Sequence, residues 1–140
     1  MAVCWVKAGV CGNEATVEVH KVSQTKVAVS ITTTCEYVEA LAQALPELDI
    51  GAEMTVPMSE TIVYRLAAQH LCRNSCIVPA AIFKAIEVAA GLFLPGESHI
   101  EFVEGAVEGR QRRATAAYKA VRESSDAYGG ESWTRTEQAG

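Results

Sequence analysis

The first third of the chain alternates apolar with polar residues, the pattern of strands that bury one face. Residues 14–20 place alanine and valine at every second position, and residues 26–33 repeat this alternation. The short polar link 21–25 joins the two segments as a hairpin. Because successive side chains of a strand point to opposite faces, one face is predicted to meet the core and the other to meet water. Residues 2–8 predict a third strand of the same kind.

The middle of the chain changes to helical spacing of its apolar residues. A first helix is predicted to begin near residue 35 and to end before a proline at 46. After a predicted loop over 51–58, a second helix is expected over 59–71. A third is expected over 79–92, where a proline suits the first helical turn. Its apolar residues cover most of its surface, so it is expected to lie at the centre of the core or against a second copy of the chain.

Together these segments predict the α+β class. The expected order is βββααα with a possible final strand over 99–103, giving a three- to four-stranded antiparallel sheet with about three helices packed on one face. Residues 1–104 are interpreted as a single cysteine-bearing domain. Residues 105–140 are more polar and contain glycine and serine, which predicts an extension with a short helix followed by a mobile tail.

Composition narrows the class of protein. The chain has 140 residues, is 49% hydrophobic and carries a formal charge of −5. The apolar fraction is that of a globular protein, and the acidic balance argues against nucleic acid as a partner. No run reaches the roughly 18 apolar residues that a membrane-spanning helix needs. The first residues show no secretory signal, so the expected location is the cytoplasm.

Five cysteines are the main chemical signal. In a cytoplasmic protein disulfides are rare, and cysteine clusters favour metal or redox chemistry. Cys11 lies in a glycine-flanked turn, Cys35 at a predicted helix start, and Cys76 just ahead of the third predicted helix. A helix N-terminus favours the thiolate form, which is both the metal ligand and the nucleophile. These three positions therefore predict a shared thiolate site.

A fourth ligand has two candidates, Cys72 and His70, which precede Cys76 by four and six residues. Cys4 alternates with core positions of the first strand and is interpreted as a small buried residue. Any single cysteine of the chain has this inert interpretation as its alternative. The pattern contains no paired Cys-x-x-Cys knuckles, so it does not name the metal.

The order of these residues resembles that of the IscU/NifU-type iron–sulfur scaffold proteins. The resemblance is carried by Val10-Cys11-Gly12-Asn13 before a strand, Cys35 opening a helix, and His70, Cys72 and Cys76 ahead of Pro79. The run from Cys76 to Pro95 is also similar to small uncharacterised domain families of anaerobic bacteria and methanogenic archaea. The likeness covers about residues 3–103.

The resemblance implies an IscU-like fold in which Cys11, Cys35 and Cys76 are cluster ligands, with His70 or Cys72 near the fourth position. In this chain Asn13 stands where the scaffold proteins have an aspartate that keeps a cluster labile. The histidine does not directly precede Cys76, and the Leu-Pro-Pro-Val-Lys chaperone motif is absent. These departures favour a retained cluster over assembly for transfer.

Three functions follow as alternatives. The first is an iron–sulfur or other thiolate-held metal protein for electron transfer or cluster handling, acting with a protein redox or cluster-handling partner. The second is a small interaction module with a structural zinc site, for which the same ligands would serve. The third is a cysteine-based thiol redox enzyme with Cys35 or Cys76 as its low-pKa nucleophile.

Overall fold

An antiparallel sheet of four strands forms one layer of the protein, here described from a computed structural model over residues 1–100. The strands are β1 (Ala2–Lys7), β2 (Glu14–Lys21), β3 (Lys26–Thr33) and β4 (Leu48–Asp49), and they lie in sequence order across the sheet. The three strands predicted from alternation are confirmed. Each strand pairs with its neighbour along the chain, so the sheet is built from local connections.

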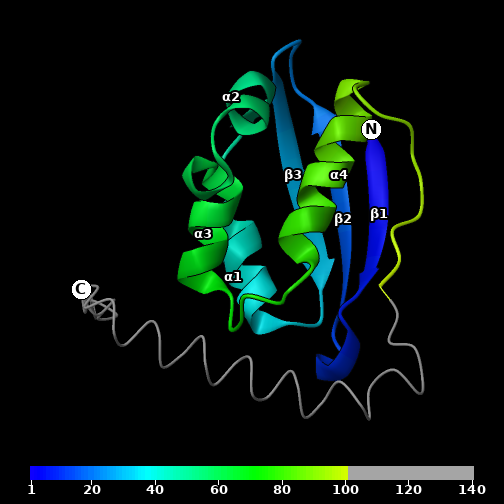
Figure 1. The fold of residues 1–140 in the computed structure, drawn as a ribbon, viewed down its shortest axis with the longest axis vertical. Coiled ribbons are helices and arrows are strands. Elements are labelled where there is room, and N and C mark those ends of the chain that lie inside the picture. The colour runs from blue at the N-terminus through cyan, green and yellow to red at the C-terminus, as the bar shows by residue number, and fades with distance from the viewer. Residues whose placement is uncertain (101–140) are drawn as a thin grey trace, which may run out of the picture. The chain divides into compact units, whose positions relative to one another are not determined.

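Helices make up the second layer (Figure 1). They are α1 (Glu36–Ala44), α2 (Ile50–Thr55), α3 (Ile62–His70) and α4 (Val78–Ala90), with 3-10 turns η1 (Gly9–Cys11) and η2 (Met58–Glu60). Helix α4 crosses β1 and β2, α1 packs on β3, and α3 packs on both of these helices. The α+β class, with an antiparallel sheet and helices on one face, is therefore confirmed.

The core lies between the sheet and the helices. Its fully buried side chains are Val17, Val19, Val27, Leu41, Leu48, Val63, Val78, Ile82 and Ile86. The valines of β2 and β3 come from the apolar positions of the alternating pattern, as one buried face requires. The third predicted helix is α4, and one face of it is buried in the core against the sheet.

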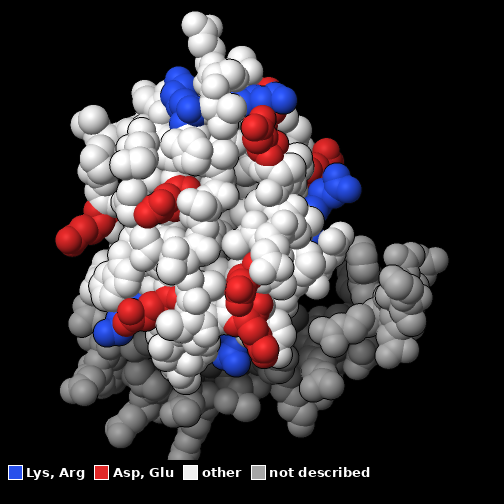
Figure 2. Space-filling model, turned by 180° about the vertical axis from the view of Figure 1, so that it is seen from behind, with Lys and Arg blue, Asp and Glu red and all other residues white. Residues whose placement is uncertain are grey.

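The other face of the sheet is exposed and mixed in character. Seen from behind, acidic and basic side chains are scattered among neutral ones (Figure 2). Trp5 on β1 is 62% exposed, and the Lys7 ammonium lies 5.9 Å from the centre of its ring. Because charged and apolar side chains are mixed on this face, it agrees with the prediction that one face of the sheet is exposed to solvent.

The predicted loop over 51–58 is wrong. This segment contains α2 and the beginning of η2, and β4 comes immediately before it. Leu48 of β4 is fully buried and pairs with Val27, while the Asp49 carboxylate accepts the Ala52 N–H at 2.9 Å and so caps α2. Elements of two and six residues are too short to show a period. The following helix, predicted from residue 59, begins at Ile62.

The end of the described chain gives no strand. His99 and Ile100, the start of the predicted last strand, are not in a strand, and residues 101–103 lie outside the described residues. The predicted extension 105–140 and its boundary at 104 also lie outside them. The chain divides into a unit of Met1–Gly96 and a unit of Glu97–Gly140, and all elements above belong to the first. Within residues 1–100, none of the helices has the length and apolar character to cross a membrane.

Candidate thiol site

Three segments that are far apart in sequence meet at one end of the first unit. They are η1, the start of α1, and the loop that joins α3 to α4, all at the lower end of Figure 1. The first carries Cys11, the second Cys35, and the third both Cys72 and Cys76. The topology therefore brings the four cysteines that the sequence singled out to the same end of the sheet and helices.

Cys11 is held on a tight turn between β1 and β2. The turn is closed at its base by the Ala8 N–H, which donates to the Asn13 carbonyl at 3.0 Å. Gly9 and Gly12 have φ angles of 78° and 72°, the left-handed conformation that glycine adopts without steric cost. Cys11 is exposed, and its thiol donates to the nearby Ala8 carbonyl at 3.8 Å.

A set of hydrogen bonds ties the base of this turn to the start of α1. The Thr34 hydroxyl donates to Asn13 Oδ1 at 3.1 Å and accepts the Glu14 N–H at 3.1 Å. The Thr33 hydroxyl donates to the Glu14 carbonyl at 2.8 Å and accepts the Cys35 N–H at 3.1 Å. We call Asn13, Glu14, Thr33 and Thr34 the threonine clasp. It fixes the Cys11 turn beside the segment that carries Cys35.

Cys35 and Cys76 lie at helix starts that have no oxygen cap. Cys35 is the N-cap residue of α1, and no side chain accepts a hydrogen bond at this position. Helix α4 begins without a side-chain cap as well, and the Val78 N–H in its first turn donates to the Cys76 sulfur. Both cysteines are half-buried against the core. The hydrogen bond from Val78 stabilises negative charge on the Cys76 sulfur.

The pKa of Cys76 reports which thiols are near it. Burial is the largest effect and raises the pKa, while the hydrogen bond from Val78 lowers it. Negative charge on Cys35, Cys72 and Cys11 raises it further. Cys35, Cys72 and Cys11 are therefore within electrostatic reach of Cys76.

The cysteines at this end do not form a finished coordination sphere. Within residues 1–100 no three cysteine, histidine, aspartate or glutamate side chains are grouped closely enough to hold a metal ion. His70 is the last residue of α3, whereas Cys72 lies in the same α3–α4 loop as Cys76.

Cys4, the fifth cysteine, belongs to the core. It is half-buried, packs against the core residues, and its thiol donates to the Ala81 carbonyl of α4 at 3.6 Å. Burial raises its pKa, so the neutral thiol is favoured. Cys4 thus packs against the core as expected, but it is half-buried rather than buried.

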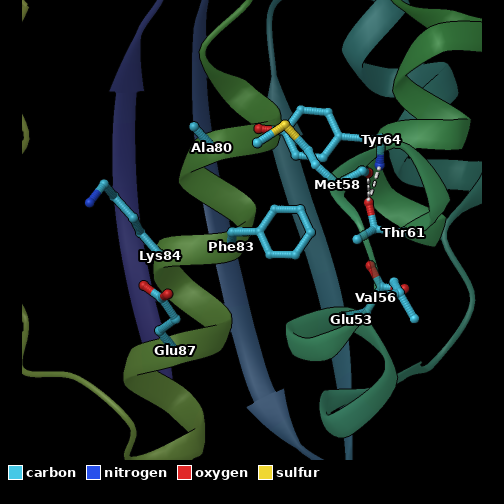
Figure 3. A pocket seen from close by; sticks show the side chains of 9 residues that line it. All are labelled: Glu53, Val56, Met58, Thr61, Tyr64, Ala80, Phe83, Lys84 and Glu87. Atoms are coloured by element: carbon cyan, nitrogen blue, oxygen red, sulfur yellow. Dashed lines mark hydrogen bonds between the residues drawn. The ribbon is translucent and has the colours of Figure 1, made fainter.

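Sequence reasoning missed a buried carboxylate on the other side of the helical layer. Glu53 of α2 is only 4% exposed, and its two oxygens accept the Ile62 and Val63 N–H groups at 2.8 and 3.3 Å. It lies at the edge of a shallow pocket of about 350 Å³ (Figure 3). Across that pocket the rings of Tyr64 and Phe83 stack with centres 5.4 Å apart. Because residues 51–58 were interpreted as a loop, no signal marked Glu53 as buried.

Comparison with other proteins gives a family without an activity. Residues 2–102 match the sequence model of a family described as of unknown function, DUF6951. No curated protein and no solved structure matches the chain. The match covers all four clustered cysteines, and a function has to be argued from the residues themselves.

Proposed function

The chain belongs to this family of unknown function, and we propose that the thiol site of this protein holds an iron–sulfur cluster or another thiolate-bound metal. The ligands are Cys11, Cys35, Cys72 and Cys76. The observation that carries the proposal is that three segments distant in sequence place these four cysteines at the same end of the first unit.

The chemistry of these donors fits such a centre. Thiolates are the usual ligands of iron–sulfur clusters and one of the common ligands of zinc. Four of them in one place repel each other, and a bound cation offsets that repulsion. The Val78 N–H that donates to the Cys76 sulfur supports the same role, because hydrogen bonds to ligand sulfurs tune a cluster's potential.

Cys72 is the preferred fourth ligand, since it lies in the loop that also carries Cys76, whereas His70 ends α3. If Cys72 rather than His70 is the fourth ligand, all four ligands are cysteines, a set that suits both an iron–sulfur cluster and a structural zinc ion. Zinc in a small interaction module therefore remains the second candidate. The thiol-enzyme alternative loses support at Cys76, because a raised pKa keeps this thiol protonated at neutral pH.

The exposure of the site indicates how such a centre would be used. Cys11 and Cys72 are exposed, whereas Cys35 and Cys76 are half-buried. A centre held by this set has one side against the protein and one side open. An open side suits electron transfer or exchange with a protein redox or cluster-handling partner, in a reducing compartment such as the cytoplasm.

The direct test is metal and acid-labile sulfide analysis after oxygen-free purification, with absorption spectra of the same samples. We expect iron with sulfide in the wild-type protein and its loss in the Cys35→Ala and Cys76→Ala variants. The Cys4→Ala variant is the matched control, because this thiol belongs to the core, and it should keep the metal. His70→Ala should also keep it.

Zinc without sulfide would decide for the structural zinc site. A wild-type protein that stays metal-free after oxygen-free purification, and also after reconstitution with iron and sulfide or with zinc, would contradict the proposal.

A further inference from the structure

We propose that residues 9–12, here called the Cys11 arm, are a hinged segment that brings Cys11 onto the other three sulfurs, and that Asn13 and Thr34 are the residues that position it. This inference rests on the proposed metal site. It goes further by assigning a movement to one ligand and a positioning role to two residues that are not ligands.

The arm has room to move and little that holds it. None of the residues of η1 is buried, and Val10 at its centre is 100% exposed. A Cβ built on Gly9 or Gly12 would meet nothing within 4 Å. The glycines at its two ends can change their backbone angles more freely than any other residue. The contact made by the Cys11 thiol is inside the same turn.

The base of the arm, by contrast, is fixed by hydrogen bonds. The threonine clasp connects Asn13 and Glu14, just after the arm, to Thr33 and Thr34 in front of α1. On the far side of the clasp the Thr33 hydroxyl receives the Cys35 N–H. One hydrogen-bonded unit thus sets the starting position of Cys11 relative to Cys35.

The segments that carry the four cysteines lie at one end of the first unit, yet residues 1–100 contain no assembled group of three ligands. A shared ion therefore requires at least one ligand to move. Cys35 and Cys76 are packed against the core at the starts of helices. The exposed thiols, Cys11 and Cys72, are the ones free to approach, and only Cys11 lies between two glycines of positive φ.

The experiment measures which thiols a bound ion protects. Cd²⁺ is added to the reduced protein, free thiols are alkylated, and modification of each cysteine is followed by mass spectrometry. In the wild-type protein we expect Cys11, Cys35, Cys72 and Cys76 to become protected and Cys4 to stay unchanged. Hydrogen exchange of the 8–14 segment should slow when Cd²⁺ is bound, because the arm is then held.

Two substitutions at one position separate positioning from folding. Thr34→Val keeps the shape of the side chain but removes the hydroxyl, and it should weaken Cd²⁺ binding about 10- to 100-fold, as loss of a ligand's supporting hydrogen bonds does. Protection of Cys11 should be lost while Cys35 and Cys76 stay protected. Thr34→Ser restores the hydroxyl and should restore both. Thr32→Val, the same change on the exposed face of the sheet, should behave as wild type.

The outcomes separate the two proposals. If Cd²⁺ protects none of the four cysteines of the wild-type protein, the metal site itself is wrong. If it protects the other three but not Cys11, or if Thr34→Val protects Cys11 as wild type does, the metal site stands and the arm is wrong. Asn13→Ala breaks the clasp from its other side, so it repeats the test should Thr34→Val fail to fold.

Discussion

The four helices of the described domain begin in two different ways. At α2 the Asp49 carboxylate accepts the Ala52 N–H, and at α3 the Thr61 hydroxyl accepts the Tyr64 N–H at 3.2 Å. The carboxylate of Glu53 takes two further N–H groups of α3. Helices α1 and α4 have no such oxygen, and each begins beside a cysteine.

The difference shows that the protein can cap a helix with oxygen and does not do so at the thiol site. An oxygen cap satisfies the free N–H groups at a helix start and stabilises the helix by about 1 kcal/mol. At α1 and α4 the free N–H groups have no oxygen cap, so this stabilisation is absent. The N–H groups remain available as hydrogen-bond donors that favour a thiolate. One pair of helix starts is therefore stabilised by oxygen caps, and under the proposed function the other pair serves the sulfur atoms.

The largest expected change in stability is at the start of α3, one of the two helices that have oxygen caps. Glu53→Ala leaves two N–H groups at the start of α3 without their acceptor, one of them on a buried residue, and should lower the free energy of unfolding by about 3 kcal/mol. Urea denaturation measures this. Glu60→Ala, which removes an exposed carboxylate of η2, should change stability by no more than about 0.5 kcal/mol. Similar values for the two variants would contradict the role given to Glu53.

A slightly smaller change in the free energy of unfolding is expected when a metal binds at the starts of α1 and α4, the two helices without oxygen caps. Zn²⁺ at about 100 times its dissociation constant should raise the free energy of unfolding by about 2.7 kcal/mol, because it binds the folded state. Cys35→Ser should lose most of this gain, and Cys4→Ser should keep it. Thermal unfolding with and without Zn²⁺ measures both, and an equal gain in Cys35→Ser and wild type would count against Cys35 as a ligand.

In the metal-free protein, the same Cys35→Ser change should raise the stability rather than lower it. Serine is a good N-cap residue, and residue 35 already has the extended backbone of that position, with φ −102° and ψ 118°. The variant should therefore be up to about 1 kcal/mol more stable than the metal-free wild type in urea denaturation. Cys35→Ala, which brings no oxygen, should show no such gain. A loss of stability in the serine variant would mean that the helix start is not short of a cap.

The smallest expected effect is a dependence of the protein's stability on pH. Burial raises the pKa of Cys4 in the folded protein, so the folded state keeps a proton that the unfolded state has lost. Stability of the metal-free protein should therefore fall as the pH rises above about 8.5, where an ordinary thiol ionises. Cys4→Ala should flatten this fall, as followed by urea denaturation at several pH values. Parallel profiles for the two proteins would show that the Cys4 thiol does not contribute.

Long patterns made most of the fold predictable. The alternation in residues 14–20 and 26–33 gave β2 and β3, and α1 and α4 began within a residue or so of their predicted positions. The elements β4 and α2 were not predicted, because they are held by a buried leucine, a capping aspartate and Glu53 rather than by a periodic pattern. Such contacts exist only after the chain has folded.

The candidate site was predictable in its residues but not in its support. Cysteines in turns and at helix starts can be seen in a sequence, and Cys11, Cys35 and Cys76 were found in this way. The contact of Asn13 with Thr34 joins positions 21 residues apart and depends on the register of the β2–β3 hairpin. The choice between Cys72 and His70 depends on where α3 ends and how the next loop runs, which spacing alone does not give.

The uncapped helix starts have a consequence for the lifetime of the protein in a cell. If a metal replaces the missing caps, the empty chain opens at α1 and α4 more often than the loaded one. Proteases cut the opened state, so empty copies would be removed first. The abundance of the protein would then follow the supply of its metal without a dedicated sensor.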